Sequence, residues 1–210
     1  PEYNAGSENY TKTLTEELLK RDNEIIIFSR EENPFLPEYN LRREVEFNGN
    51  LVKYIINMAR TKDRFLSKEV DIRFREILKR AKPDVVHFQH LNHLSLSLPS
   101  EVKKMNLPSI YTLHDFWLMC PRGQFIQSNL QGEPWNFCDG QEDSKCARNC
   151  YSRFFTGKDG SEEDISYWTD WVNSRMEFSR KAVKDIDLFV SPSKTFLESF
   201  KRSFPEDAEK

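Results

Sequence analysis

A histidine and an aspartate lie side by side at the end of a predicted strand, where an imidazole and a carboxylate could bind a polar ligand or move a proton. The run from Ile110 to Leu113 follows Pro108 and is rich in β-branched and aromatic residues, which predicts a buried strand just before His114 and Asp115. If the sheet is parallel, this carboxyl edge opens into a ligand-binding crevice, where an imidazole can hydrogen-bond a hydroxyl or relay a proton near neutral pH. From the pattern alone, a satisfied strand-end histidine and an aspartate that caps the next turn explain the pair equally well.

A second constellation consists of the four cysteines of the chain, Cys120, Cys138, Cys146 and Cys150. Four thiolates suffice for a closed tetrahedral zinc site, which could give order to an irregular loop. The spacing is not a paired CxxC pattern, so disulfides and unligated thiols are the alternatives. We expect a structural zinc ion, because no export signal points to an oxidising compartment.

A third candidate is the segment from Asn4 to Ser7, which immediately precedes a predicted helix. Backbone amides at such a position can point at an anion with the helix dipole behind them, and Gly6 would let a phosphate or a sugar approach closely. The alternative is a simple turn in which Ser7 caps the helix.

Composition restricts the kinds of protein this chain can be. Its 210 residues and 38% hydrophobic content suit one large domain with a buried core, and a net charge of −3 with well-mixed charges excludes a general attraction to nucleic acid. No apolar run approaches the roughly 20 residues of a membrane-spanning helix, and no signal peptide is recognisable. We therefore expect a cytoplasmic protein, with peripheral contact at the inner face of the membrane as a further expectation.

Strand and helix patterns alternate along the chain, which predicts an α/β fold with a parallel sheet flanked by helices. Residues 31–50 are expected to form a long surface connection, and residues 118–160 a cysteine-bearing loop insertion that contributes no core element. Strands are predicted at residues 25–28, 85–88, 109–113 and 188–190, and helices at residues 7–20, 51–60, 67–79, 94–104, 162–184 and 193–202.

Four segments, in order along the chain, resemble the amino-terminal domain of the family 4 retaining glycosyltransferases, two-domain GT-B enzymes that transfer sugars from nucleotide donors. One is the His-Asp motif with the residues around it, and the others look like a glycine loop, a "PDVVH" strand and a closing strand with its serine turn. The four segments are Pro1–Glu8, Lys82–Phe88, Thr112–Gly123 and Asp187–Ser193.

The resemblance implies that residues 1–210 form the Rossmann-like, acceptor-side half of such an enzyme. The family's first strand would precede Pro1, and its absence would leave a gap in the sheet. The donor-binding domain would follow Lys210, and since that domain holds most of the nucleotide-sugar donor, the chain alone is expected to be inactive. The acceptor would be a glycan, a lipid-linked glycan or a cell-surface polysaccharide. The rival hypothesis is a non-catalytic Rossmann-like binding module with a structural zinc loop.

The resemblance also assigns residues to the site. His114 matches the family histidine that faces the donor sugar and is the catalytic candidate. Retaining transfer in this family is thought to use donor phosphate oxygens to help deprotonate the acceptor, so neither a protein nucleophile nor a catalytic metal is expected. Some relatives carry a similar cysteine group after this motif, which adds to the case for zinc. The substrate-binding candidates are Gly6, Glu8, Gln89, His90, Asn92, Asp115 and Arg122.

Two substrate-binding candidates keep a structural alternative. Asp115 is equally suited to orienting its own turn, and Arg122 to an ordinary surface position. The chain also departs from the family at two places: Gln89 stands where the family often has histidine, and Ala5-Gly6 stands where it often has two glycines.

Overall fold

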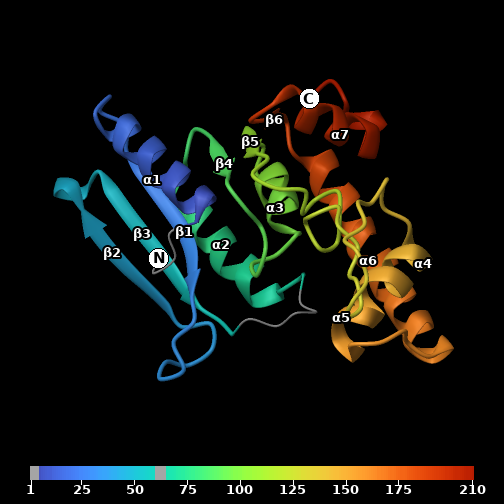
Figure 1. Ribbon diagram of the computed structural model, residues 1–210. Coiled ribbons are helices and arrows are strands. Elements are labelled where there is room, and N and C mark those ends of the chain that lie inside the picture. The colour runs from blue at the N-terminus through green and yellow to red at the C-terminus, as the bar shows by residue number, and fades with distance from the viewer. Residues whose placement is uncertain (1–4, 60–64) are drawn as a thin grey trace. The chain divides into compact units, whose positions relative to one another are not determined.

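The computed structural model describes residues 5–59 and 65–210 (Figure 1). The chain divides into two compact units, Pro1–His114 and Asp115–Lys210. Parallel strands alternate with helices, which confirms the predicted α/β class with a Rossmann-like arrangement. Among the described residues, none of the helices combines the length and the hydrophobicity that a membrane-spanning segment requires.

The first unit opens with helix α1 (Gly6–Leu19) and a three-stranded sheet. Its strands are β1 (Ile25–Glu31), β2 (Leu41–Glu46) and β3 (Leu51–Asn57), in the order β1-β3-β2. Strands β1 and β3 run parallel, whereas β2 pairs antiparallel with β3 at the edge (Figure 1). A short helical turn, η1 (Phe47–Gly49), joins β2 to β3.

Two predictions for this region are wrong. The helix expected at residues 51–60 is strand β3, in which Leu51, Ile55 and Ile56 are buried. A short apolar run fits a helix and a buried strand equally well, and pairing with β1 on one side and β2 on the other decides between them. The long connection expected at residues 31–50 contains β2, which was not predicted because most of its residues are charged. Arg42 of this strand forms an ion pair with Glu31 of β1.

The rest of the first unit contains helix α2 (Lys68–Ala81), strand β4 (Val86–Phe88), helix α3 (Leu98–Lys104) and strand β5 (Ser109–Thr112). Strands β4 and β5 are parallel neighbours. All four elements were predicted, although α3 starts four residues later than expected. Its proline lies in the first turn, where a missing amide hydrogen costs no helical bond.

The second unit is built around a long helix. Ser161 and Asp164 cap its amino terminus reciprocally, and Val172, Met176 and Val183 on its apolar face are buried. Its elements are α4 (Asp143–Cys146), the wider helical turn η2 (Ala147–Ser152), α5 (Arg153–Thr156), α6 (Glu162–Asp185), β6 (Leu188–Val190), α7 (Lys194–Ser203) and η3 (Pro205–Asp207). Helices α6 and α7 and strand β6 confirm the predictions.

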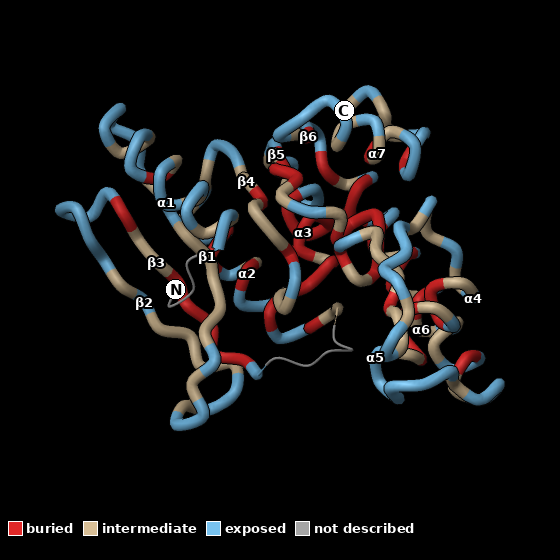
Figure 2. Tube along the Cα trace, viewed as in Figure 1, coloured by how far each residue is buried: buried red, intermediate tan, exposed pale blue. Residues whose placement is uncertain are grey.

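The segment predicted as a coreless insertion does contribute to a core. Cys146, Cys150 and Tyr151 form a buried cluster with Val172 and Met176 of α6 (Figure 2). The prediction failed because the helical turns of residues 143–156 are too short to show a periodic apolar pattern.

Candidate active site

His114 follows β5 directly, and its ring meets the side chain of the residue that follows β4. The Nε2 atom of His114 lies 2.9 Å from Oε1 of Gln89, and both side chains are partly buried. Because β4 and β5 are parallel neighbours, their carboxyl ends lie at the same sheet edge. With this placement of the amide oxygen, Nε2–H of His114 donates to Gln89.

Helix α1 reaches the same histidine through Tyr10. The Tyr10 and His114 rings meet edge to face, with 5.1 Å between their centroids and 70° between their planes. Tyr10 is 41% exposed, so this contact lies at the surface of the first unit. It ties the amino-terminal part of α1 to the edge that carries His114. No pattern in the sequence indicates that Tyr10 belongs to the site.

The start of α1 differs from a simple capped turn. The helix begins at Gly6, its N-cap Ala5 is extended, and no side chain of residues 5–59 or 65–210 caps it. Ser7 lies inside the helix, where its hydroxyl donates to Oε2 of Glu8 at 2.9 Å, so the alternative in which Ser7 is the cap is wrong. A Cβ atom added to Gly6 would meet nothing within 4 Å. The fold itself therefore does not require glycine here. Asn4 lies outside the described residues.

A second histidine of this edge was missed by the sequence analysis. His87, in β4, places its Nε2 atom 2.8 Å from the hydroxyl oxygen of Thr112 in β5. Burial lowers the pKa of His87, and the positive charge that His114 can carry lowers it further. Two imidazoles therefore lie close enough to influence each other's protonation. The available signal was a titratable side chain inside a short apolar strand.

His90 and Asn92 form a local structure beyond β4. The backbone N–H of Asn92 donates to Nδ1 of His90 at 2.9 Å, which fixes the His90 ring against its own loop. Asn92 is exposed and His90 is partly buried. Their roles as substrate-binding residues remain predictions.

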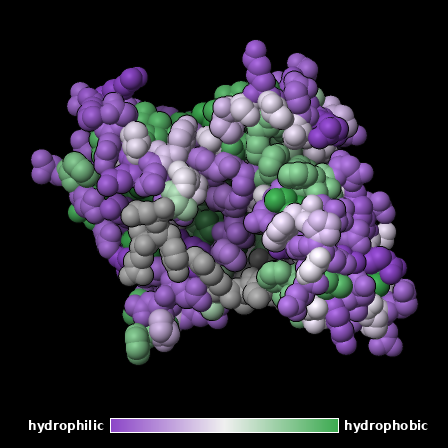
Figure 3. Space-filling model, in the orientation of Figure 1, coloured by the Kyte–Doolittle hydropathy of each residue, from purple (hydrophilic) through white to green (hydrophobic). Residues whose placement is uncertain are grey.

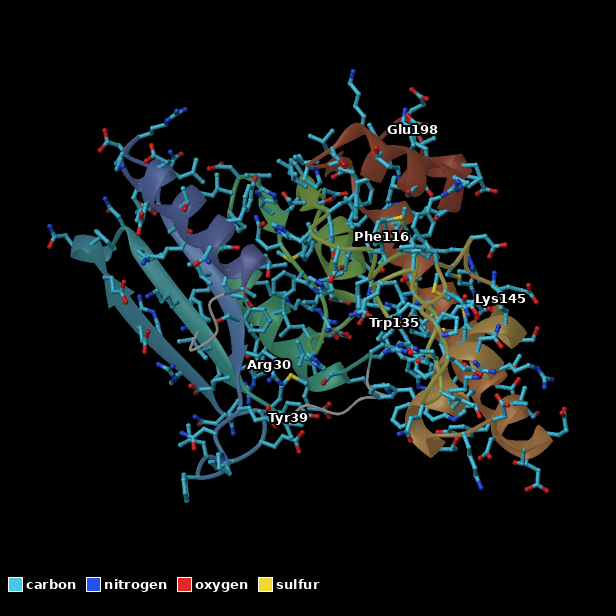
Figure 4. The ribbon with its side chains drawn as sticks, viewed as in Figure 1. Arg30, Tyr39, Phe116, Trp135, Lys145 and Glu198 are labelled. Carbon is cyan, nitrogen blue, oxygen red and sulfur yellow. The ribbon has the colours of Figure 1, made fainter. Side chains whose placement is uncertain are left out.

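Asp115 and Arg122 belong to the second unit. Oδ1 of the exposed Asp115 accepts the backbone N–H of Trp117 at 2.8 Å, so this carboxylate does orient its own turn. The Arg122 guanidinium lies over the ring of Phe154, 4.8 Å from its centroid. Phe116, labelled in Figure 4, stacks on Phe196, and Figure 3 shows hydrophobic surface on this part of the second unit.

The four cysteines all lie in the second unit as free thiols, with Cys120, Cys146 and Cys150 buried and Cys138 partly buried. Burial, together with the charge that the other three cysteines can carry, raises the pKa of Cys146 to about 12. Four cysteines are nevertheless a ligand set that zinc accepts, because the metal binds them as thiolates. In residues 5–59 and 65–210, however, no three histidine, cysteine, aspartate or glutamate side chains are arranged to hold a metal ion.

Comparison with known families settles the affiliation of the chain. The sequence profile of Glycosyltransferase Family 4 matches residues 4–210, which is nearly the whole chain. The chain belongs to this family. The parallel strands and flanking helices of the structure are consistent with membership of this family.

A curated relative of this glycosyltransferase domain is described as an uncharacterized 42.6 kDa protein in the cps region of Klebsiella pneumoniae. It is 26% identical to the chain over 143 residues, which cover 60% of the chain and 37% of the relative. The match thus spans little more than a third of the relative's length.

Proposed function

We propose that this family 4 domain is the acceptor-side half of a retaining glycosyltransferase. The enzyme would move a sugar from a nucleotide-sugar donor to a glycan, and the cps-region relative makes a lipid-linked or cell-surface polysaccharide our preferred acceptor. The observation that carries the proposal is the His114 imidazole, held by Gln89 and Tyr10 at the carboxyl edge of parallel strands. Open α/β folds bind their ligands at such edges.

The proposed role of His114 is to orient a sugar hydroxyl. Its hydrogen bond to Gln89 fixes the plane of the ring, so the imidazole would meet a sugar hydroxyl in a defined direction. Tyr10 restricts the ring from a second side. Orientation of this kind contributes to catalysis by holding the reacting groups in a productive geometry.

In the transfer itself, the bond between the anomeric carbon of the donor sugar and the nucleotide phosphate oxygen breaks. A new bond forms from the acceptor hydroxyl oxygen to that carbon, and the hydroxyl proton passes to the departing phosphate. No protein nucleophile or metal is required for this balance. The chain contributes positioning and hydrogen bonds.

The start of α1 is proposed to face the substrate. No side chain in the described part of the chain caps its first amides, and Gly6 presents no Cβ, so a phosphate or sugar could approach them. We assign Glu8, Gln89, His90, Asn92, Asp115 and Arg122 to sugar or anion binding, with the nucleotide held mainly by a second domain. A membrane-embedded acceptor would place the enzyme at the cytoplasmic face of the membrane.

The function is tested by presenting the intact protein with a panel of nucleotide sugars and membrane-derived acceptors and measuring nucleotide release. Residues 1–210 alone serve as the matched control. We expect transfer by the intact protein with at least one donor and none by the control. Transfer by residues 1–210 alone would refute the proposal that these residues are only the acceptor-side half of the enzyme. A folded but inactive intact protein would favour the non-catalytic binding module.

We further propose that Cys120, Cys138, Cys146 and Cys150 bind one structural zinc ion. All four thiols lie in one unit, and the chemistry of the set supports zinc. Since the described arrangement brings no three of these donors together, binding requires their side chains to move. Protein purified without added zinc should contain about one ion per chain, as expected of a tight four-thiolate site. Absence of metal, with either four free thiols or two disulfides, would refute this proposal.

A further inference from the structure

A positively charged side chain is buried in the middle of α6. Arg175 is 1% exposed, and it is the largest of the fully buried side chains of the described residues. A charge is costly to remove from water unless it is well hydrogen-bonded. Burial of an arginine therefore indicates that its guanidinium has a specific task.

The contacts of Arg175 converge on Trp117. Nη2 donates to the backbone carbonyl oxygen of Trp117, and the guanidinium carbon lies 4.4 Å from the centroid of the Trp117 ring. Nη1 donates to Oγ of Ser179, one turn along the helix, at 2.9 Å. Arginine can do all of this at once because its planar fork presents several donors and also stacks on an aromatic face.

Trp117 belongs to a loop that closes on itself. The backbone N–H of Phe116 donates to the carbonyl oxygen of Gly123 at 3.3 Å, and the N–H of Cys120 donates to that of Phe116 at 2.7 Å. The N–H of Trp117 donates to the carboxylate of Asp115. These hydrogen bonds connect the segment Asp115–Gly123 internally. Trp117 is the residue of this segment that Arg175 contacts.

We propose that Arg175 is a positioning residue, which fixes the Asp115–Gly123 loop through Trp117 and thereby sets the direction of the Asp115 carboxylate. This inference rests on the proposed function, in which Asp115 binds substrate. Arg175 itself touches no substrate. A lysine could not replace it, because an ammonium group is a point charge without the planar fork.

The test compares Arg175→Met and Arg175→Lys with two controls in the intact protein. Arg180→Met removes an exposed arginine from the same helix. Val183→Ala creates a cavity at a fully buried position of that helix and so lowers stability while leaving the Arg175 side chain in place. Each variant is measured for melting temperature, kcat, KM for the acceptor, and hydrogen exchange of the amides of residues 116–120.

We expect both Arg175 variants to exchange these loop amides at least tenfold faster than the wild type and to lose at least tenfold in kcat/KM. Arg180→Met should match the wild type, and Val183→Ala should melt earlier while keeping wild-type loop exchange and turnover. If Arg175→Met does not fold, Arg175→Lys carries the same comparison, because it keeps the charge and most of the stem.

Two results would overturn the positioning role: loop exchange that stays at the wild-type rate in the Arg175 variants, or a loss of turnover no larger than that of Val183→Ala at an equal melting temperature. A wild-type protein that transfers no sugar is a different result, because it would overturn the proposed function and with it the catalytic part of this inference.

Discussion

Replacing His114 with alanine should separate turnover from stability. The side chain is partly buried, hydrogen-bonds the Gln89 side chain and meets the Tyr10 ring edge to face. A hydrogen bond contributes about 1 kcal/mol and an aromatic pair about 0.5–1.5 kcal/mol, so His114→Ala should cost about 1–3 kcal/mol in unfolding free energy. Since a domain of this kind has about 5–15 kcal/mol of stability, the variant should remain folded.

Turnover should respond far more strongly. A positioned histidine of this type contributes about a hundredfold or more to the rate, which corresponds to about 2.7 kcal/mol of transition-state free energy. The assay is steady-state sugar transfer by the intact protein, with circular dichroism and thermal melting of the same preparations. Gln89→Ala is the matched variant, because it removes the same hydrogen bond but leaves the imidazole; its loss of turnover should be smaller. Wild-type turnover in His114→Ala, or a variant that fails to fold, would refute the site assignment.

Three further predictions concern other parts of the chain. Gly6→Ala should leave the melting temperature unchanged or higher, because an added Cβ meets nothing within 4 Å, yet raise KM; an unchanged KM would exclude close substrate approach at Gly6. Because the pKa of His87 is lowered from 6.5 in the folded state, the folded protein binds fewer protons than the unfolded chain, so this residue should make the protein less stable as the pH falls below about 6.5. Urea unfolding between about pH 5 and pH 8 should show this loss in the wild type and a smaller loss in His87→Gln, and equal pH dependence would contradict it. Gly160→Ala should destabilise the protein by about 1–3 kcal/mol, because its Cβ would lie 1.7 Å from Oγ of the buried Ser152; a melting temperature equal to that of Gly6→Ala would show that the site relaxes.

Sequence patterns predicted helices correctly where the helix is long or begins with a capping residue. Helix α6 carries a capping box at Ser161 and many turns of amphipathic pattern, and α2 carries Ser67 as its N-cap with Val70 and Phe74 on its apolar face. Strand β3 was mistaken for a helix because its seven residues are too few to reveal a period, and its identity depends on the strands beside it. Strand β2 is stabilised by cross-strand pairs such as Lys53 with Glu46, which depend on register.

The candidate site, too, could be predicted only in part from the sequence. The meeting of Gln89 and His114 could be predicted because both residues end adjacent parallel strands. Tyr10 could not, since its position depends on how α1 packs against the sheet edge. The burial of Arg175 also could not be predicted from the sequence, because an arginine on a long amphipathic helix is normally solvent-exposed. Only its contact with Trp117 in the structure indicates its role.

In the proposed function, the chain forms half of a sugar-transferring site with His114 at its edge. Its most direct test is the transfer of a labelled sugar to a membrane-derived acceptor by the intact protein, measured side by side for wild type and His114→Ala. We expect labelled product from the wild type, with the anomeric configuration of the donor retained, and about a hundredfold less from the variant. Equal product from both proteins, or inversion of the anomeric configuration, would contradict it.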